Sequence, residues 1–183
     1  MNSLVKIILN IVPRSILTRL SFLLKPLIKI YLSGNKYIDP IDGSSFRKFL
    51  PYGYNNVRKN ALSPSTFSLE RHRLLWLYLK NETDFFNKDL KVLHFAPEAA
   101  FLEKFKKLKN ISYDTIDLNS PLANIKADIC DLPLDDESYD FILCNHVLEH
   151  VIDDKKAMQE LYRVLKKDGI GIFQVPINIS NKK

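Results

Sequence analysis

An acid at the end of a short apolar segment stands where a carboxylate can bind a sugar. Asp117 lies near the end of the segment SYDTIDL, residues 112–118, which has the composition of a strand. It follows the turn after an earlier apolar segment, residues 91–96, by about 20 residues, the spacing at which nucleotide-binding folds place an acid on the ribose diol. The pattern predicts that Asp117 binds a ribose. The alternative is an acid that only closes a turn at the strand end.

Asn145 and His146 form a polar pair directly after another apolar segment, residues 139–144. An imidazole at this place can accept a proton, and His146 is a better-placed candidate than Glu149 or His150. The same residues match the H-x-x-E-H pattern of inverted zinc proteases. That match is short, follows a strand of a parallel sheet and has no evident third ligand. A metal site is therefore not expected here.

The elements around these residues predict a parallel sheet. The apolar segment 139–144 is followed by a charged amphipathic stretch, residues 153–167, and then by a second apolar segment, residues 170–175. This order is that of a β-α-β unit, which binds its ligand at the carboxyl ends of its strands. The acids between positions 131 and 137 are predicted to form a solvated loop rather than a metal site.

Residues 127–176 also carry a motif with several parts. It consists of an acid, a Leu-Pro-Leu segment, an aromatic-Asp pair before an apolar strand, and a Leu-Glu-His-Val tail, here Asp128, Leu132–Leu134, Tyr139–Asp140 and Leu148–Val151. This stretch resembles class I S-adenosylmethionine-dependent methyltransferases of the type 11 kind. The resemblance covers about half of the chain, from Lys91 onward.

The resemblance implies an α/β fold with a Rossmann-like parallel sheet in the strand order 3-2-1-4-5, and S-adenosylmethionine as cofactor. It implies that residues at three strand ends contact the cofactor: Asp117 and Leu118 at the ribose and adenine, Asp128 and Ile129 at the adenine amino group, and Asn145 and His146 beside the methyl group. Methyl transfer from an activated donor depends mainly on proximity and alignment. A base such as His146 is needed only when the acceptor must lose a proton.

The turn after the first strand departs from the family pattern. The family has D-x-G-x-G there, because glycines let the backbone approach the methionine end of the cofactor. This chain has no glycine in the turn, and the residues expected to contact the cofactor are His94, Phe95, Ala96 and Glu98. His94 stands in the place of the family's acid, and Glu98 can restore a carboxylate nearby.

The family's sheet has seven strands, whereas this chain ends at Lys183, eight residues after Val175. Five strands are therefore expected, with the C-terminal strands missing. The chain is then a fragment, a protein whose open edge a partner covers, or a reduced relative. The expected function is methyl transfer to a small or lipid-linked acceptor. The alternative is a catalytically degenerate module that keeps the fold and binds a ligand or partner.

Residues 1–36 predict an amphipathic helical arm. Polar residues recur at steps of three or four, at positions 6, 10, 14, 18, 21, 25 and 29, and leave a wide apolar face. Pro13 and Pro26 are expected to break or kink the arm into shorter helices. No uncharged run approaches the roughly 20 residues that span a bilayer. The arm therefore either lies on an anionic membrane surface or packs on protein.

Two similar turns, residues 39–43 and 63–67, bracket a segment that suits a small hairpin. With cysteine at positions 39, 42, 63 and 66 the pattern would be that of a zinc ribbon. Methyltransferase-like proteins to which the resemblance extends carry such a module. Here all four thiolates are absent, so residues 37–67 are interpreted as a degenerate, zinc-free ribbon, followed by the methyltransferase domain at 68–183. Such a ribbon is held by its aromatic residues and by packing on the main domain, or it is loosely ordered. The alternative is that the two turns are only turns.

The net charge of +6 belongs to the N-terminal arm. Residues 1–38 carry six basic side chains and no acid, while the rest of the chain sums to zero. The body therefore gives no reason to expect nucleic acid as a partner. Cys130 and Cys144 are expected to be buried free thiols in a reducing cytosol. The expected location is cytoplasmic, with peripheral attachment to the inner face of the membrane through the arm.

Overall fold

The computed structural model describes residues 14–53 and 56–177, with side chains from Leu23 onward in the first range. Contacts divide the chain into two compact units, residues 1–78 and 79–183. The three predicted parts, 1–36, 37–67 and 68–183, stay a prediction.

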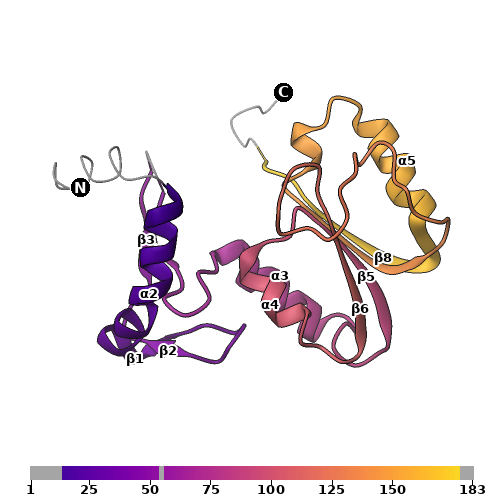
Figure 1. The fold of residues 1–183 in the computed structure, drawn as a ribbon. Helices are drawn as coiled ribbons and strands as arrows, with labels where there is room; N and C mark the ends of the chain where they lie inside the picture. Colours follow the sequence, from indigo (N-terminus) through magenta and orange to yellow (C-terminus); the bar gives the residue numbers. More distant parts are fainter. Residues whose placement is uncertain (1–13, 54–55, 178–183) are drawn as a thin grey trace. The chain divides into compact units, whose positions relative to one another are not determined.

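A four-stranded parallel sheet forms the centre of the second unit (Figure 1). Its strands are β5 (Leu90–Phe95), β6 (Ile111–Ile116), β7 (Tyr139–Asn145) and β8 (Leu165–Gln174), in the order β6-β5-β7-β8. This order matches four of the five predicted positions, 2-1-4-5. The predicted α/β fold with a Rossmann-like parallel sheet is confirmed.

The predicted third strand, ending at Asp128 and Ile129, is wrong in the described residues. Only one parallel bridge, between Ile116 and Ile125, stands in its place. Asn124 explains the difference, because its Oδ1 accepts bonds from the backbone amide and the hydroxyl of Thr115, at 2.5 and 2.7 Å. A side chain that satisfies backbone donors locally competes with a strand ladder.

Helices cover both faces of this sheet, α4 (Ala99–Phe105) on one and α5 (Asp154–Val164) on the other (Figure 1). Side chains alternate between the faces along each strand. One set of β5 and β7 residues, including Leu93 and Ile142, packs with Leu161 and Val164 of α5. The opposite set packs with aromatic rings of α4 and of the preceding segment: Phe85 lies 5.1 Å from Phe141, and Phe105 lies 6.3 Å from His94, between ring centroids.

The N-terminal end of α5 is capped by Asp153, whose carboxylate accepts the amide of Lys156 at 2.9 Å. Its C-terminal end comes three residues before the predicted Lys167, because the chain turns extended at Leu165 to enter β8.

The first unit contains α2 (Arg14–Leu32) and two antiparallel strand pairs, β1 (Ser33–Ile38) with β2 (Ser45–Phe46) and β3 (Leu50–Tyr52) with β4 (Arg58–Leu62). The following helix, α3 (Glu70–Asn81), begins in this unit. A small core joins α2 to the first pair through buried Leu32, Phe46 and Phe49.

Of the break or kink expected at Pro26, the break is wrong, because the residue lies inside the continuous helix α2. The proline is on the exposed side of the helix, where water can bond to the carbonyl that loses its amide partner. The earlier polar positions of the predicted stripe, 6, 10, 14, 18 and 21, and the break predicted at Pro13 lie outside the residues whose side chains are described. Among the described helices, none has the length and apolar character needed to cross a bilayer.

Candidate functional site

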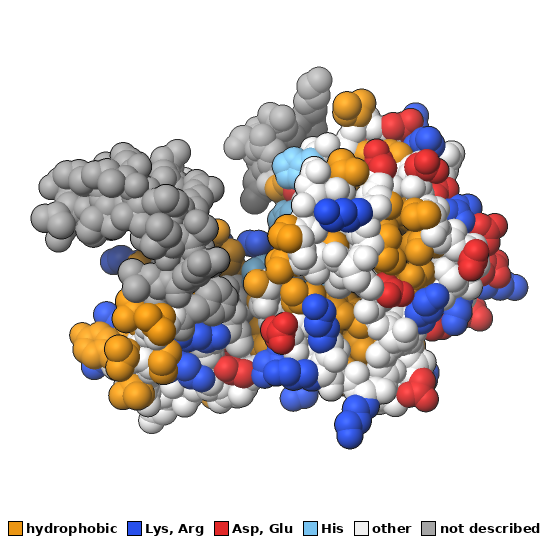
Figure 2. Space-filling view, in the orientation of Figure 1, with side chains coloured by type: hydrophobic (Ala, Val, Ile, Leu, Met, Phe, Trp, Pro, Cys, Tyr) orange, Lys and Arg blue, Asp and Glu red, His pale blue; other side chains and the backbone are white. Residues whose placement is uncertain are grey.

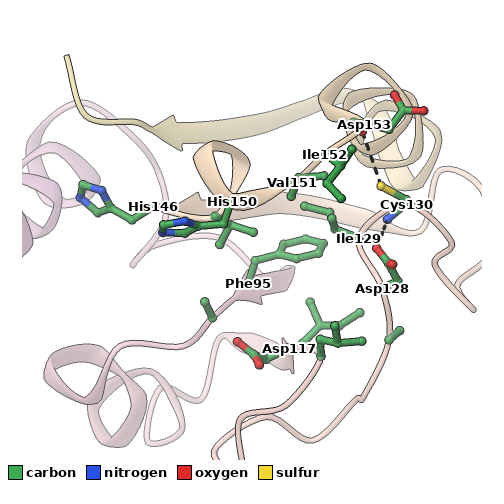
Figure 3. A pocket seen from close by; sticks show the side chains of 15 residues that line it. Phe95, Asp117, Asp128, Ile129, Cys130, His146, His150, Val151, Ile152 and Asp153 are labelled. Atoms are coloured by element: carbon green, nitrogen blue, oxygen red, sulfur yellow. Dashed lines mark hydrogen bonds between the residues drawn. The ribbon is translucent and has the colours of Figure 1, made fainter. Parts of the chain in front are cut away.

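A cavity of about 540 Å³ opens at the carboxyl ends of β5, β6 and β7 (Figure 3). This volume falls within the roughly 300–1,000 Å³ typical of small-molecule sites. Seven of the ten residues predicted to form the site line it: Phe95, Ala96, Asp117, Leu118, Asp128, Ile129 and His146. All but Asp128 and Ile129 lie at or directly after the ends of strands that are distant in sequence, and the parallel arrangement brings these ends to one edge.

The turn after β5 keeps a glycine-like backbone without glycine. Ala96 has φ of 46°, in the left-handed region, and its amide donates to the carbonyl of Ile116 at 2.9 Å. That conformation costs a residue with a Cβ about 1–2 kcal/mol. The small side chain of alanine limits the crowding, and the buried Phe95 beside it forms part of the cavity wall. The glycine-free turn therefore still opens onto the cavity.

Asp117 lies at the end of β6 and is half-buried in the cavity wall. Its Oδ1 accepts the amides of Asn119 and Ser120, at 2.8 and 2.6 Å. One carboxylate oxygen thus closes the local turn, which is the structural role considered for this acid. In Figure 3 its side chain lies on one side of Phe95, and Val151 lies on the other.

Asp128 and Ile129 lie on the same cavity although they are not in a strand. The Oδ1 of Asp128 accepts the amide of Cys130 at 2.9 Å, which forms a tight turn and leaves the carboxylate exposed at the rim. Ile129 is buried, whereas Leu118, which also lines the cavity, is 59% exposed. An exposed leucine and buried apolar groups on one cavity form a surface suited to a flat, weakly polar ring.

Three predicted residues, His94, Glu98 and Asn145, are absent from the lining and instead form a chain of polar contacts. Asn145 Nδ2 donates to Glu98 Oε2 at 3.0 Å, and His94 Nε2 lies 3.5 Å from the same oxygen. His94 is fully buried, and its Nδ1 is 2.7 Å from the hydroxyl of Tyr113. Burial, and next the charge of Glu98, raise the pKa of Tyr113, which keeps it protonated.

Sequence reasoning missed Tyr113, although a signal was present. His94 pairs with Thr115 in the parallel register, so Tyr113, two residues earlier in β6, shares its face of the sheet. A buried histidine needs a polar partner on that face.

His146 follows β7 and also adopts a left-handed backbone, with φ of 55°. Its Nδ1 lies 3.2 Å from Oε1 of Glu149, and its side chain is 37% exposed at the cavity. A non-glycine residue in this conformation is uncommon and often marks a functional position. An imidazole held by a carboxylate at the edge of a cavity can accept a proton from a bound molecule.

The opposite wall comes from the segment after β7, which sequence reasoning did not assign to the site. Val147, His150, Val151, Ile152 and Asp153 line the cavity there. The Leu-Glu-His-Val tail was the available signal, because segments after strand ends surround ligands in parallel sheets.

Cys130 faces this segment, with Sγ 3.5 Å from the carbonyl of Asp153. Partial burial, and next Asp128, raise its pKa and favour the thiol. Both cysteines are free; Cys144 is buried as predicted, while Cys130 is only half-buried.

Within residues 14–53 and 56–177, no group of three or more His, Cys, Asp or Glu side chains is arranged to hold a metal ion. In the loop predicted to be solvated, Asp136 lies 2.6 Å from Arg163 and so pairs with α5.

Comparison with known proteins places this geometry in a family. Residues 82–173 match the family described as "Methyltransferase domain". The chain is 31% identical over 118 residues to the ubiquinone/menaquinone biosynthesis C-methyltransferase UbiE of Campylobacter jejuni, covering 54% of this chain and 46% of that protein. It is 42% identical over 45 residues to a demethylmenaquinone methyltransferase of Clavibacter sepedonicus, covering 25% of this chain and 18% of the other.

The chain thus spans less than half the length of these curated relatives. A solved structure from Galdieria sulphuraria, assigned as a sarcosine dimethylglycine methyltransferase, has a TM-score of 0.49 and 22% identity, covering 78% of this chain and 52% of that chain. The family match itself covers half of the chain. The chain therefore belongs to the methyltransferase-domain family.

Proposed function

We propose that this chain transfers the methyl group of S-adenosylmethionine to a small or lipid-linked acceptor, with the donor bound in the cavity at the ends of β5, β6 and β7. The observation that carries the proposal is the single cavity on which Asp117, Asp128 and His146 meet. When bound, S-adenosylmethionine supplies a methyl group already activated on a sulfonium.

The lining fits the nucleoside part of this donor. The carboxylate of Asp117, already held by two backbone amides, is the acceptor for the ribose diol. Leu118 and Ile129 offer apolar surface for the adenine, and the exposed carboxylate of Asp128 accepts its amino group. The left-handed Ala96 brings backbone close to the methionine end.

His146 is the proton acceptor for an acceptor molecule that must lose a proton. Its contact with Glu149 orients the ring at the edge of the cavity. Catalysis then depends on alignment of donor and acceptor and, for such a substrate, on removal of the proton by Nε2 of the imidazole.

The names of two relatives suggest the acceptor class. Both are methyltransferases of quinone biosynthesis, one acting on demethylmenaquinone and one named a C-methyltransferase. We propose a prenylated aromatic acceptor of this kind, because its ring is compact while its tail is held in a membrane.

The outer face of α2 supports a location at such a membrane. Leu23, Leu27, Ile30 and Tyr31 are 63–75% exposed on it, and Figure 2 shows hydrophobic side chains gathered over this helix. The face is rich in apolar area, and the six basic residues of positions 1–38 occur without an acid. Such a helix fits the surface of an anionic bilayer, into which its apolar side chains insert.

Calorimetry with S-adenosylhomocysteine tests the donor site. The chain should release heat at one site, and Asp117→Ala should weaken binding by about tenfold or more, as expected for loss of charge-assisted hydrogen bonds. The exposed Asp89→Ala is the matched control. Absence of binding to the unsubstituted chain, or equal binding by Asp117→Ala, would contradict the proposed site.

Sedimentation with vesicles tests the location. Phosphatidylglycerol vesicles should carry the chain down at low salt and less at high salt, whereas phosphatidylcholine vesicles should carry less. The double variant Leu27→Glu with Ile30→Glu should stay in the supernatant. Leu74→Glu, at an equally exposed position of α3, serves as control. If the double variant sedimented as much as the Leu74→Glu control, the membrane proposal would be wrong. The proposed donor site does not depend on this result.

A further inference from the structure

The two turns noted in the sequence, residues 39–43 and 63–67, have the same backbone geometry. In each, the backbone amide of the fifth residue donates to the carbonyl of the first residue, Gly43 to Asp39 at 2.8 Å and Phe67 to Ser63 at 3.1 Å. The amide of the first residue in turn donates to the carbonyl of the residue directly after the turn, at 2.9 Å in both cases. The fifth residue is left-handed in both, with φ of 73° and 57°. The two turns are therefore equivalent, although their sequences share little beyond proline.

The side chains of the two turns meet at a buried carboxylate. Asp39 has no exposed surface, and its Oδ2 accepts the hydroxyls of Thr66 at 2.5 Å, Ser68 at 3.3 Å and Ser65 at 3.4 Å. These donors lie 26 to 29 residues further along the chain. The carboxylate thus joins one turn to the other and to the start of α3.

The Ser65 hydroxyl lies at the centre of the group. Besides Asp39, it contacts Oδ1 of Asp42 at 3.2 Å and the hydroxyl of Ser63 at 3.1 Å. Since Thr66 binds Asp39 directly, the side chains at 39, 42, 63 and 66 all surround one small volume. These are the first and fourth positions of the two equivalent turns.

Two cations lie near the carboxylates of this group. Lys29 of α2 is 4.0 Å from Asp42. Arg73 of α3 interacts electrostatically with Asp39 and donates a hydrogen bond to the carbonyl of Ser68 at 2.7 Å. Two negative charges are therefore accompanied by two positive ones, and a buried carboxylate needs such compensation.

We propose that this group is a metal-free clasp, in which hydroxyl–carboxylate bonds hold together two turns whose four inward positions have the geometry of a tetrahedral metal site. The side chains at all four positions end in oxygen rather than sulfur, and the Ser65 hydroxyl lies 3.1–3.4 Å from oxygens of three of them, Asp39, Asp42 and Ser63. Lys29 and Arg73 provide the positive charge. The inference concerns the first unit alone and does not depend on the proposed acceptor or donor site. It adds polar bonds to the aromatic contacts expected in this segment, such as those of Phe49 with Tyr37 and Phe46.

The geometric part of the proposal is tested by restoring thiolates. A full-length variant with cysteine at positions 39, 42, 63 and 66 and Ser65→Ala should bind one Co²⁺ per chain, with the visible absorption of tetrahedral thiolate coordination. The unsubstituted chain should show no such absorption at the same cobalt concentration. Binding without the tetrahedral spectrum, or binding at a stoichiometry other than one, would overturn the shared centre. If the variant is unfolded without metal, Co²⁺ should restore the fluorescence of Trp76, the only tryptophan of the chain.

The clasp itself is tested in the otherwise unchanged chain. Urea unfolding followed by Trp76 fluorescence should show that Thr66→Val and Ser68→Ala each lower the folding equilibrium constant of the first unit about tenfold, the cost of leaving a carboxylate short of a donor. Ser45→Ala, an exposed serine in the same unit, should change it little. A strong chelator should leave the unsubstituted chain unaffected. Unfolding of the unsubstituted chain by the chelator would overturn the proposal. So would a result in which Thr66→Val and Ser68→Ala are both as stable as Ser45→Ala.

Discussion

Asn145 at the end of β7 donates from Nδ2 to Oε2 of Glu98, 3.0 Å away, and so ties two neighbouring strand ends together across the edge that forms the cavity. Both residues were expected to touch the donor, yet neither is part of the lining. Ala96, two residues before Glu98, and His146, directly after Asn145, do line it, and both have a left-handed backbone. The bond thus joins the two turns that line the cavity.

Loss of this bond should weaken donor binding indirectly. Asn145→Ala should lower the free energy of unfolding by about 1.5–3 kcal/mol, because a partly buried carboxylate loses a donor. It should also weaken S-adenosylhomocysteine binding in calorimetry, since the turns lose their spacing. Asn87→Ala, at an exposed position, is the control. Binding that stays unchanged while stability falls would show that the chain of polar groups does not position the cavity.

The backbone of Ala96 predicts an order among substitutions. Ala96→Gly should keep donor binding, because glycine adopts a positive φ readily. Ala96→Val should abolish it and lower the thermal midpoint, because a β-branched residue is strongly strained in this region and would crowd the cavity. Calorimetry and thermal unfolding of the two variants, measured side by side, provide the check. A valine variant that binds like the original would mean that the left-handed turn is not needed.

Acid should remove a specific contribution to stability. Hydrogen bonds from Arg163 lower the pKa of Glu160 from 4.5 to about 2. Because this carboxylate binds a proton more weakly when folded, its stabilisation is complete above pH 4.5 and is lost as the pH falls toward 2. Glu160→Gln should therefore be clearly less stable than the original at pH 7, and the gap should close over that interval. Urea titrations at several pH values test this.

The control for that pH series is Glu103→Gln, at an exposed position with no arginine partner like Arg163 among the described residues. Its difference from the unsubstituted chain should stay small at every pH. A gap for Glu160→Gln that persists unchanged at pH 2 would mean that the pair with Arg163 is not the source of the stabilisation.

Removal of the imidazole should separate chemistry from binding. His146→Ala should slow methyl transfer to an acceptor that must lose a proton by about 10²–10⁴-fold, the usual contribution of a general base. It should leave S-adenosylhomocysteine binding nearly unchanged. Glu149→Gln should cause a smaller loss in kcat, because the ring stays but is less firmly oriented. Rates with a demethylated quinol in vesicles provide the measurement, and an unaffected kcat in His146→Ala would remove this residue from the mechanism.

Several parts of this molecule could be predicted from local pattern alone. The apolar runs that became β5 and β7 bury both faces, and such runs read as strands of a parallel sheet whatever surrounds them. Asp117 and His146 follow their strands directly, so their meeting at one edge comes from the topology. The likeness of the two proline-containing turns was also visible, because turn geometry depends on a few adjacent residues.

Local pattern failed where distant residues compete with neighbouring ones. The third strand was lost because Asn124 bonds to Thr115 in place of a ladder partner. Pro26 was tolerated because its side of α2 faces solvent. The spacing of polar residues along the helix does not reveal this.

The amino-acid sequence by itself determined the parallel sheet, the family motif and the edge at which polar residues gather, since these depend on periodicity and on residues close together in the chain. Only the tertiary structure decided that His94 meets Tyr113, that Glu98 meets Asn145, and that Asp39 meets Thr66. Each of these contacts joins residues 19 or more positions apart. A polar side chain has many chemically equal partners, and packing of the apolar faces selects which of them comes within hydrogen-bonding distance.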